Sequence, residues 1–249
     1  MRNVNKYLAT TALPLVLGAA LFAAPANATL QISANINGTI FSCADQAACD
    51  TNLAAGQLEI ANQTIAGVQF LGSSQTQVIG ATNSLNTSSF QINNLNATSV
   101  NILFAVSGIG FLGPVTSFSA SGSGTFQSAI GSTVTETFWA DVANAQGADN
   151  PTDLPGALLA SLTHNALLAT DSFSQNFSGP FADTDLYSMS EGTTGTIVAH
   201  GSLVGRTQAI VTTQVPEPAS LGLFGLGLLG LGFVLRRRRN KDGGNLAAA

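Results

Sequence analysis

Apolar residues stand at every second position in several stretches of the chain, and this spacing constrains the fold more than any other feature. In the stretch 98–106, Val, Ile, Phe and Val occupy the even positions from 100 onward. Successive side chains of a β-strand point to opposite faces, so a period of two predicts a half-buried strand. The stretches 30–36, 118–130 and 133–142 alternate similarly, and Asn37-Gly38 after the first of them is a hairpin signal.

About ten short segments of this kind, separated by Gly, Ser and Asn, predict an all-β fold. We expect a single antiparallel β-sandwich, jelly-roll-like, with one short helix. The helix is predicted over Asp153–Ala169, because Asp153 can cap it and Pro155 suits its first turn. Trp139 shares one strand face with threonines, so it is either an exposed platform or covered by a second sheet, and we expect burial.

The start of the chain reads as a secretory signal peptide over residues 1–28. It has a basic beginning, an apolar run from 8 to 24 and an A-x-A cleavage site formed by Ala26 and Ala28. This pattern predicts export by Sec-type machinery and cutting by signal peptidase. The extracytoplasmic domain is then expected to cover residues 29–214.

The end of the chain has the form of a membrane anchor. Residues 219–235 carry no charge, and 17 residues at about 1.5 Å rise reach the short end of what spans a bilayer core of roughly 30 Å. Four basic residues follow at once. Their charges oppose transfer through hydrocarbon, which predicts a transmembrane helix with the body outside the inner membrane. These topogenic residues are Arg236, Arg237, Arg238 and Arg239.

Directly before the apolar span lies the motif Pro216-Glu217-Pro218. The motif, the span and the basic cluster, in this order over residues 215–239, closely resemble the PEP-CTERM sorting signal of Gram-negative bacteria. The resemblance implies recognition by an exosortase, a membrane-embedded cysteine transpeptidase that cuts near the motif and hands the protein on. An ordinary C-terminal anchor is the alternative. Residues 240–249 form a short polar tail to which we assign no role.

The predicted body is strongly acidic. It contains eleven Asp and Glu residues against a single basic residue, Arg206, which gives a net charge of −10. Such a surface repels phosphates and anionic lipid headgroups, so the sequence excludes nucleic acid as a partner. Its remaining polar surface has to come from Ser, Thr, Asn and Gln.

The chain has two cysteines, Cys43 and Cys49, with five residues between them. It is predicted to enter a compartment where disulfides persist. We predict that they form a disulfide. Metal binding is the alternative, and it would require both His164 and His200 to converge on the same loop.

No catalytic residue is predicted. The chain has neither a G-x-S-x-G elbow nor an H-E-x-x-H helix. Spacing alone leaves open a triad that combines His164 or His200 with one of the many serines and an acid. No cofactor is predicted either.

Calcium is the weak metal candidate, because clustered carboxylates supply the oxygen ligands that this ion prefers. One group of acids is Asp183, Asp185 and Glu191. A second group surrounds an expected loop and consists of Asp141, Asp149, Asn150 and Asp153. Neither group has the spacing of an EF-hand, and acids that only keep the surface soluble are the alternative.

These features predict an exported protein, first held at the inner membrane with its body in the periplasm, then placed on the cell surface or in the extracellular matrix. We expect a structural or adhesive component associated with exopolysaccharide, because an uncharged polar surface suits hydrogen bonding to hydrated sugars. The alternative is a secreted hydrolase of matrix polymers or esters. A histidine bonded to a serine and an acid in a cleft would favour the hydrolase, and an open sheet face would favour binding.

Overall fold

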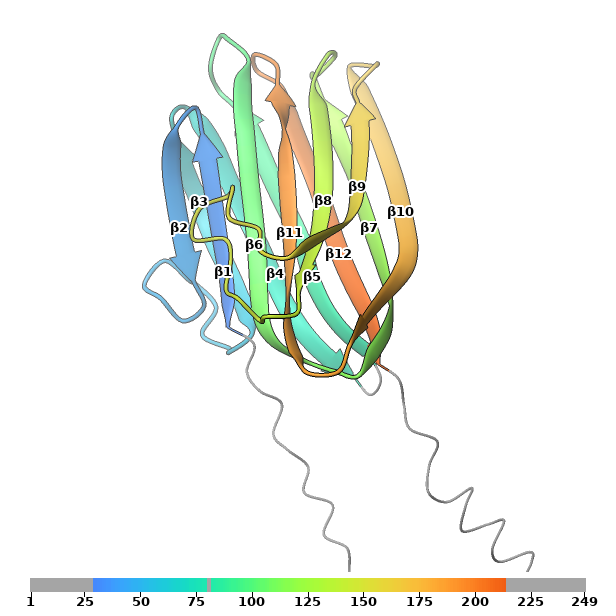
Figure 1. Cartoon of the computed structure of the whole chain (residues 1–249). Helices are drawn as coiled ribbons and strands as arrows, with labels where there is room; N and C mark the ends of the chain where they lie inside the picture. Colours follow the sequence, from blue (N-terminus) through green and yellow to red (C-terminus); the bar gives the residue numbers. More distant parts are fainter. Residues whose placement is uncertain (1–28, 80–81, 214–249) are drawn as a thin grey trace, which may run out of the picture.

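The structure, a computed structural model, describes residues 29–79 and 82–213. All regular elements in these ranges are β-strands, and they form two stacked antiparallel sheets (Figure 1). In chain order they are β1 (Leu30–Ile36), β2 (Thr39–Ala44), β3 (Gln57–Ile65), β4 (Val68–Ile79), β5 (Thr82–Asn94), β6 (Val100–Leu112), β7 (Val115–Gln127), β8 (Thr133–Asp141), β9 (Ala157–Asn165), β10 (Thr170–Asp183), β11 (Leu186–Ile197) and β12 (Ser202–Thr213).

The predicted β-sandwich is confirmed. Sheet A has the strand order β2-β1-β6-β11-β8-β9, and sheet B has the order β10-β7-β12-β5-β4-β3. The partners β5 and β12, β6 and β11, β7 and β10, and β8 and β9 are all antiparallel neighbours. Eight strands therefore form one long double strand wound around the sandwich, as in a jelly roll.

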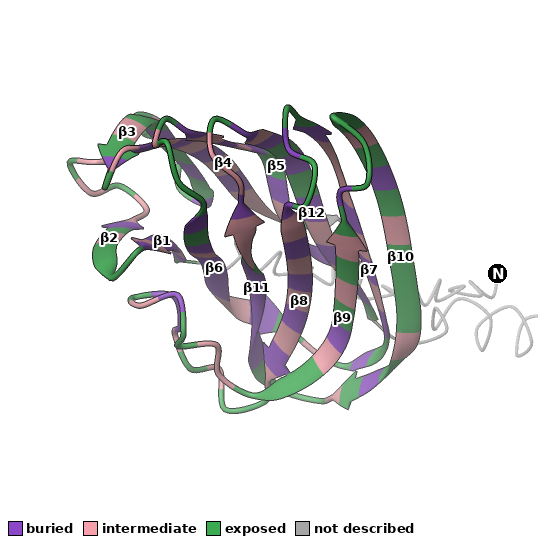
Figure 2. Ribbon diagram, turned by 90° about the horizontal axis from the view of Figure 1, so that it is seen from above, coloured by how far each residue is buried: buried purple, intermediate pink, exposed green. Residues whose placement is uncertain are grey.

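The core lies between the sheets and follows the predicted alternation. On β6, Val100, Ile102, Phe104 and Val106 are buried, whereas Asn101 between them is exposed. The ring of Phe104 packs across the sandwich, with its centroid 5.1 Å from that of Phe70 on β4. Figure 2 shows the resulting alternation of buried and exposed positions along the strands.

The predicted hairpin at Asn37-Gly38 is present. Both residues have positive φ, 49° and 87°, which suits the two-residue turn between β1 and β2. The predicted disulfide joins Cys43 on β2 to Cys49 in the following loop, with 5.9 Å between their Cα atoms.

The helix predicted over Asp153–Ala169 is wrong. Residues 153–156 are loop, and Ala157–Asn165 form strand β9, which pairs with the free edge of β8. Gly156 has a φ of 86°, and a Cβ there would clash with the backbone of Ala140, so the chain turns at this glycine. A strand results because backbone pairing with β8 outweighs a weak helical preference of the local sequence.

A long loop, residues 142–156, runs over the outer face of sheet A (Figure 1). The backbone N–H of Gly147 donates to the Ser107 hydroxyl on β6, at 3.1 Å, and the Leu154 side chain covers Gly192 on β11. Trp139 lies on this outer face and is half-buried. The expectation that a second sheet covers Trp139 is therefore wrong, because its side chain points away from sheet B.

The signal peptide at 1–28, the sorting motif, the span 219–235, the arginine cluster and the tail 240–249 lie outside the described residues. Within the described ranges, no helix has the length and apolar character that crossing a membrane requires.

Two acidic residues lie in the core, which the sequence did not indicate. Glu136 on β8 is 1% exposed, and neither of its carboxyl oxygens has a hydrogen-bond partner among the described residues. Glu191 on β11 accepts hydrogen bonds at Oε2 from the hydroxyls of Thr207, at 2.6 Å, and Thr87, at 2.8 Å. Burial raises the pKa of Glu136 to about 8, helped by the nearby Glu191, and raises the pKa of Glu191 to about 7.

These shifts make the folded state sensitive to alkali. In the unfolded chain both carboxyls ionise near pH 4.5, whereas in the folded state they hold their protons to about pH 7 and 8. Their contribution to the free energy of unfolding is therefore complete below pH 4.5 and is lost as pH rises through the folded-state pKa values. We expect the free energy of unfolding, from urea titrations, to fall by on the order of 4–6 kcal/mol between pH 5 and pH 8.

The variant Glu136→Gln should show a smaller fall, because an amide does not ionise. The control Glu59→Gln changes an exposed carboxylate on β3 and should keep the wild-type fall. An undiminished fall in Glu136→Gln would contradict this account.

Candidate functional site

In the part of the chain that the structure describes, no loop crosses the outer face of sheet B, whereas the loop 142–156 crosses part of the outer face of sheet A (Figures 1 and 2). Strand β7 supplies its centre. In β7, hydroxyl residues at every second position face outward, and Phe118, Ala120 and Gly122 between them are buried. The outward hydroxyl residues of β7 are Ser117, Ser119, Ser121, Ser123 and Thr125.

Strand β10 extends this polar face on one side of β7. Ser172 lies opposite Thr125, and their hydroxyl oxygens are 2.9 Å apart. The next outward positions of β10 are Ser174, Asn176 and Ser178, which pair in register with Ser123, Ser121 and Ser119. The two strands therefore present two parallel rows of short polar side chains.

Strand β12 extends the face on the other side of β7. Its outward residues Arg206 and Gln208 pair with Ser123 and Ser121. Beyond them, Asn86 of β5 pairs with Gln208. The four strands together form what we call the polar face: the outward residues of β7, β10 and β12 with Asn86.

Three hollows follow one another along the polar face. The middle one has a volume of about 240 Å³, and the others have volumes of about 350 Å³ and about 460 Å³. The middle hollow is lined by Asn86, Ser121, Gly122, Ser123, Ser174, Arg206, Thr207 and Gln208. Ser123 and Arg206 also line the 350 Å³ hollow, so these two hollows adjoin.

The hollows exist because small residues occupy both sides of β7. Gly122 has no side chain, and the space that its Cβ would fill on the inner side holds the Glu136 carboxyl. Gly124 similarly leaves room for the ring of Phe173. Outward serines are short, so the surface stays recessed between the longer side chains of Arg206 and Gln208.

Arg206 is the one strong positive charge of the polar face. It is exposed, and its Nε donates a hydrogen bond to the Ser123 hydroxyl at 3.2 Å. Among the described residues the single ion pair joins His164 to Asp171, so no carboxylate pairs with Arg206.

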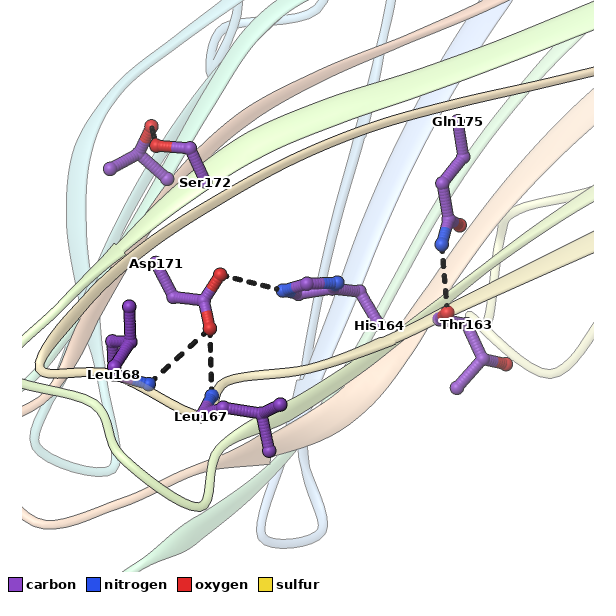
Figure 3. A network of polar contacts seen from close by, with 8 residues as sticks. Thr163, His164, Leu167, Leu168, Asp171, Ser172 and Gln175 are labelled. Atoms are coloured by element: carbon purple, nitrogen blue, oxygen red, sulfur yellow. Dashed lines mark hydrogen bonds and ion pairs between the residues drawn. The ribbon is translucent and has the colours of Figure 1, made fainter.

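The two histidines of the sequence prediction are not brought together. His164 on β9 contacts Asp171 on β10, with 3.2 Å between Nε2 and Oδ1 (Figure 3). The His164 ring also stacks on that of Phe173, with 4.7 Å between the ring centroids. His200 lies in the turn before β12, with a φ of 57°, and its backbone N–H donates to Asn96.

The contact between His164 and Asp171 holds a turn together. Oδ2 of Asp171 accepts the backbone N–H groups of Leu167, at 2.7 Å, and Leu168, at 3.3 Å (Figure 3). The hydrogen bond from Leu167, aided by His164, lowers the pKa of Asp171. Ser172 points elsewhere and bonds Thr125, so the described residues give His164 an acid but no serine partner.

The calcium candidates are also separated. Glu191 is buried between the sheets, whereas Asp183 and Asp185 lie at the turn between β10 and β11. Oδ1 of Asp183 accepts the backbone N–H groups of Thr184 and Asp185, which fixes that turn. Within the described ranges, no three His, Cys, Asp or Glu residues are grouped so as to hold a metal ion, and this includes the loop acids Asp141, Asp149 and Asp153.

Sequence reasoning missed the polar face. Its signal was present, because serine or threonine recurs at every second position from 117 to 125 and serine at 172, 174 and 178. What the sequence did not indicate is that β7, β10 and β12 are neighbours, since these strands are far apart in the chain.

The buried side of β7 generates one prediction. In Gly122→Ala the new methyl group would meet the Glu136 carboxyl, so we expect the free energy of unfolding to fall by about 1–3 kcal/mol. Ser121→Ala, the outward neighbour, should change it by less than about 0.5 kcal/mol. In a Glu136→Ala background the cost of Gly122→Ala should largely vanish. An equal cost in both backgrounds would show that this packing contact is not what requires glycine.

A model of the PEP-CTERM protein-sorting motif matches residues 214–239. No curated protein matches the chain. Among solved structures, TmCBM61 in complex with beta-1,4-galactotriose is similar at 9% identity over 61% of this chain and 91% of that chain, with a TM-score of 0.31. The C-terminal CBM6 of LamC from Zobellia galactanivorans is similar at 8% identity over 63% and 99%, with a TM-score of 0.24. At these TM-scores the likenesses carry no argument about function.

Proposed function

Because the chain carries a PEP-CTERM protein-sorting motif, which marks an exported protein that is membrane-associated before processing, we propose that it is an exosortase substrate whose body binds exopolysaccharide. Binding takes place on the polar face of sheet B, and the protein serves as a structural or adhesive component of the cell surface or matrix. The observation that carries this proposal is the recessed, hydroxyl-rich polar face, which no loop among the described residues crosses, whereas the loop 142–156 crosses part of the opposite sheet.

The chemistry of the polar face suits sugars. Hydroxyls and amides both donate and accept hydrogen bonds, as sugar hydroxyls do, and they are spaced by the regular repeat of the strands. Serine has few rotamers to lose, so binding costs little side-chain entropy. Three hollows in a row offer positions for successive residues of a polymer.

The arrangement of the termini fits a body tethered at one end. The start of β1 and the end of β12 lie at the same end of the sandwich (Figure 1), where Thr29 contacts Ile109 and Thr213 pairs with Val115. With the tail 219–235 in the inner membrane, the strands lead away from that end. The polar face then stands to the side of the tether and is accessible before and after processing.

The hydrolase alternative is less well supported. It has one observation in its favour, the contact between His164 and Asp171. That contact fixes a turn between two edge strands, and a serine nucleophile is not part of it among the described residues.

Blocking the middle hollow should weaken binding. In Ser121→Ile an apolar, β-favouring side chain fills the hollow, and we expect binding to exopolysaccharide from the producing bacterium to fall at least about tenfold in affinity electrophoresis. The matched control is Thr194→Ile, an exposed position on the outer face of β11 in sheet A, which should bind like wild type. Equal binding by both variants would place the site elsewhere, and a wild-type protein that does not bind would refute the proposed function.

Removal of the two terminal segments during processing can be detected from the mass of the recovered protein. Protein recovered from cells and medium should lack residues 1–28 and the segment that follows the exosortase cut near Pro216-Glu217-Pro218, as measured by intact mass spectrometry. Recovery of the chain with its first and last residues in place would contradict the sorting half of the proposal.

A further inference from the structure

We infer that the polar face selects acidic over neutral polysaccharide, with the guanidinium of Arg206 holding a carboxylate or sulfate group of the sugar chain. This inference rests on the proposed function and names the ligand class of the same site.

Arg206 is singular in the body. It is the only Lys or Arg among the described residues, in a body with eleven acids, and no acid pairs with it. Its Nε is engaged by Ser123, which orients the planar group and leaves the two terminal nitrogens for a ligand. A guanidinium fork matches two oxygens of a carboxylate or sulfate.

The position of Arg206 is central to the recessed surface. It lines the 240 Å³ hollow together with Asn86 and Gln208, and it lines the 350 Å³ hollow together with Thr125 and Ser172. Sugar rings in the two adjoining hollows would therefore have the guanidinium between them. Its neighbours in the two hollows are neutral: hydroxyls and amides, which suit sugar hydroxyls, and the apolar Val204 and Phe173 in the 350 Å³ hollow.

The acids of the body are kept away from this surface. Strands β4, β5, β7 and β12 contain no Asp or Glu, and the two acids of β10 are at its ends, with Asp171 turned to His164. The exceptions are Glu136 and Glu191, which are buried beneath the middle hollow, Glu136 against Gly122 and Glu191 bonded to Thr207. Burial raises the pKa of both carboxyls and so favours their neutral form. Glu59 is on β3, three strands from β12, a distance of about 14 Å, which exceeds a Debye length of about 8 Å at physiological salt.

This distribution leaves Arg206 as the one charged side chain beside the two adjoining hollows. An anionic polymer is repelled by the acidic loops and finds its one attractive charge on the polar face. The charge pattern thus orients an anionic polymer as well as strengthening its binding, because contacts between the polymer and the acidic loops are disfavoured.

The test compares polymers that differ only in charge. Purified protein is titrated by affinity electrophoresis at physiological salt, about 0.15 M, with polygalacturonate, with its methyl-esterified neutral form, and with a sulfated galactan beside its unsulfated parent. We expect wild type to bind an acidic form about tenfold more tightly than its neutral counterpart. Arg206→Gln should lose this preference and bind the acidic and neutral members of each pair equally. Arg206→Lys retains the charge without the fork and should keep only part of the preference.

Each outcome decides between the two claims. A preference for the polyuronate assigns the anion to carboxylate, and a preference for the sulfated galactan assigns it to sulfate. Equal binding to acidic and neutral forms, or an acidic preference that persists in Arg206→Gln, overturns this inference and leaves the proposed function standing. Failure of wild type to bind any of these polymers or the native exopolysaccharide overturns both. Matching thermal unfolding curves for wild type and both variants show that folding is not the cause.

Discussion

Neighbouring residues of a β-strand point to opposite faces, and in strand β7 this alternation builds the core and the polar face at the same time. Phe118, Ala120 and Gly122 face inward, and the serines between them face outward. A shift of one residue in register would bury the hydroxyls and expose the apolar residues, so the pairing of β7 with β10 and β12 is strongly specified. The polar face is therefore a direct consequence of how the sandwich packs.

The same packing accounts for the burial of two acidic residues, Glu136 and Glu191, between the sheets. Glu136 occupies the space that Gly122 leaves on the inner side, and Glu191 is held by Thr87 and Thr207 from sheet B. Glu191 thereby links the two sheets, whereas Glu136 makes no hydrogen bond among the described residues, and neither carboxyl is exposed at the surface. With the other acids on loops, strand ends and β3, Arg206 dominates the polar face.

Much of the fold could be predicted from the sequence, and the reasons are local. The strand around Phe104, the hairpin at Asn37-Gly38 and the disulfide of Cys43 with Cys49 all depend on residues close together in the chain. Prediction from the sequence failed where the structure of a segment depends on its contacts with residues far away in the chain. Strand β9 was predicted as a helix because the edge of β8 that it pairs with was not visible, and Glu136 was counted as a surface acid.

The central claim is that the polar face is where polysaccharide is held. Backbone amide shifts recorded by nuclear magnetic resonance during titration with exopolysaccharide oligomers test it most directly. The account predicts shifts concentrated on the outward positions of β7, β10 and β12, around Ser121 and Arg206. Shifts concentrated on the loop 142–156 or on sheet A, with β7 unchanged, would contradict it.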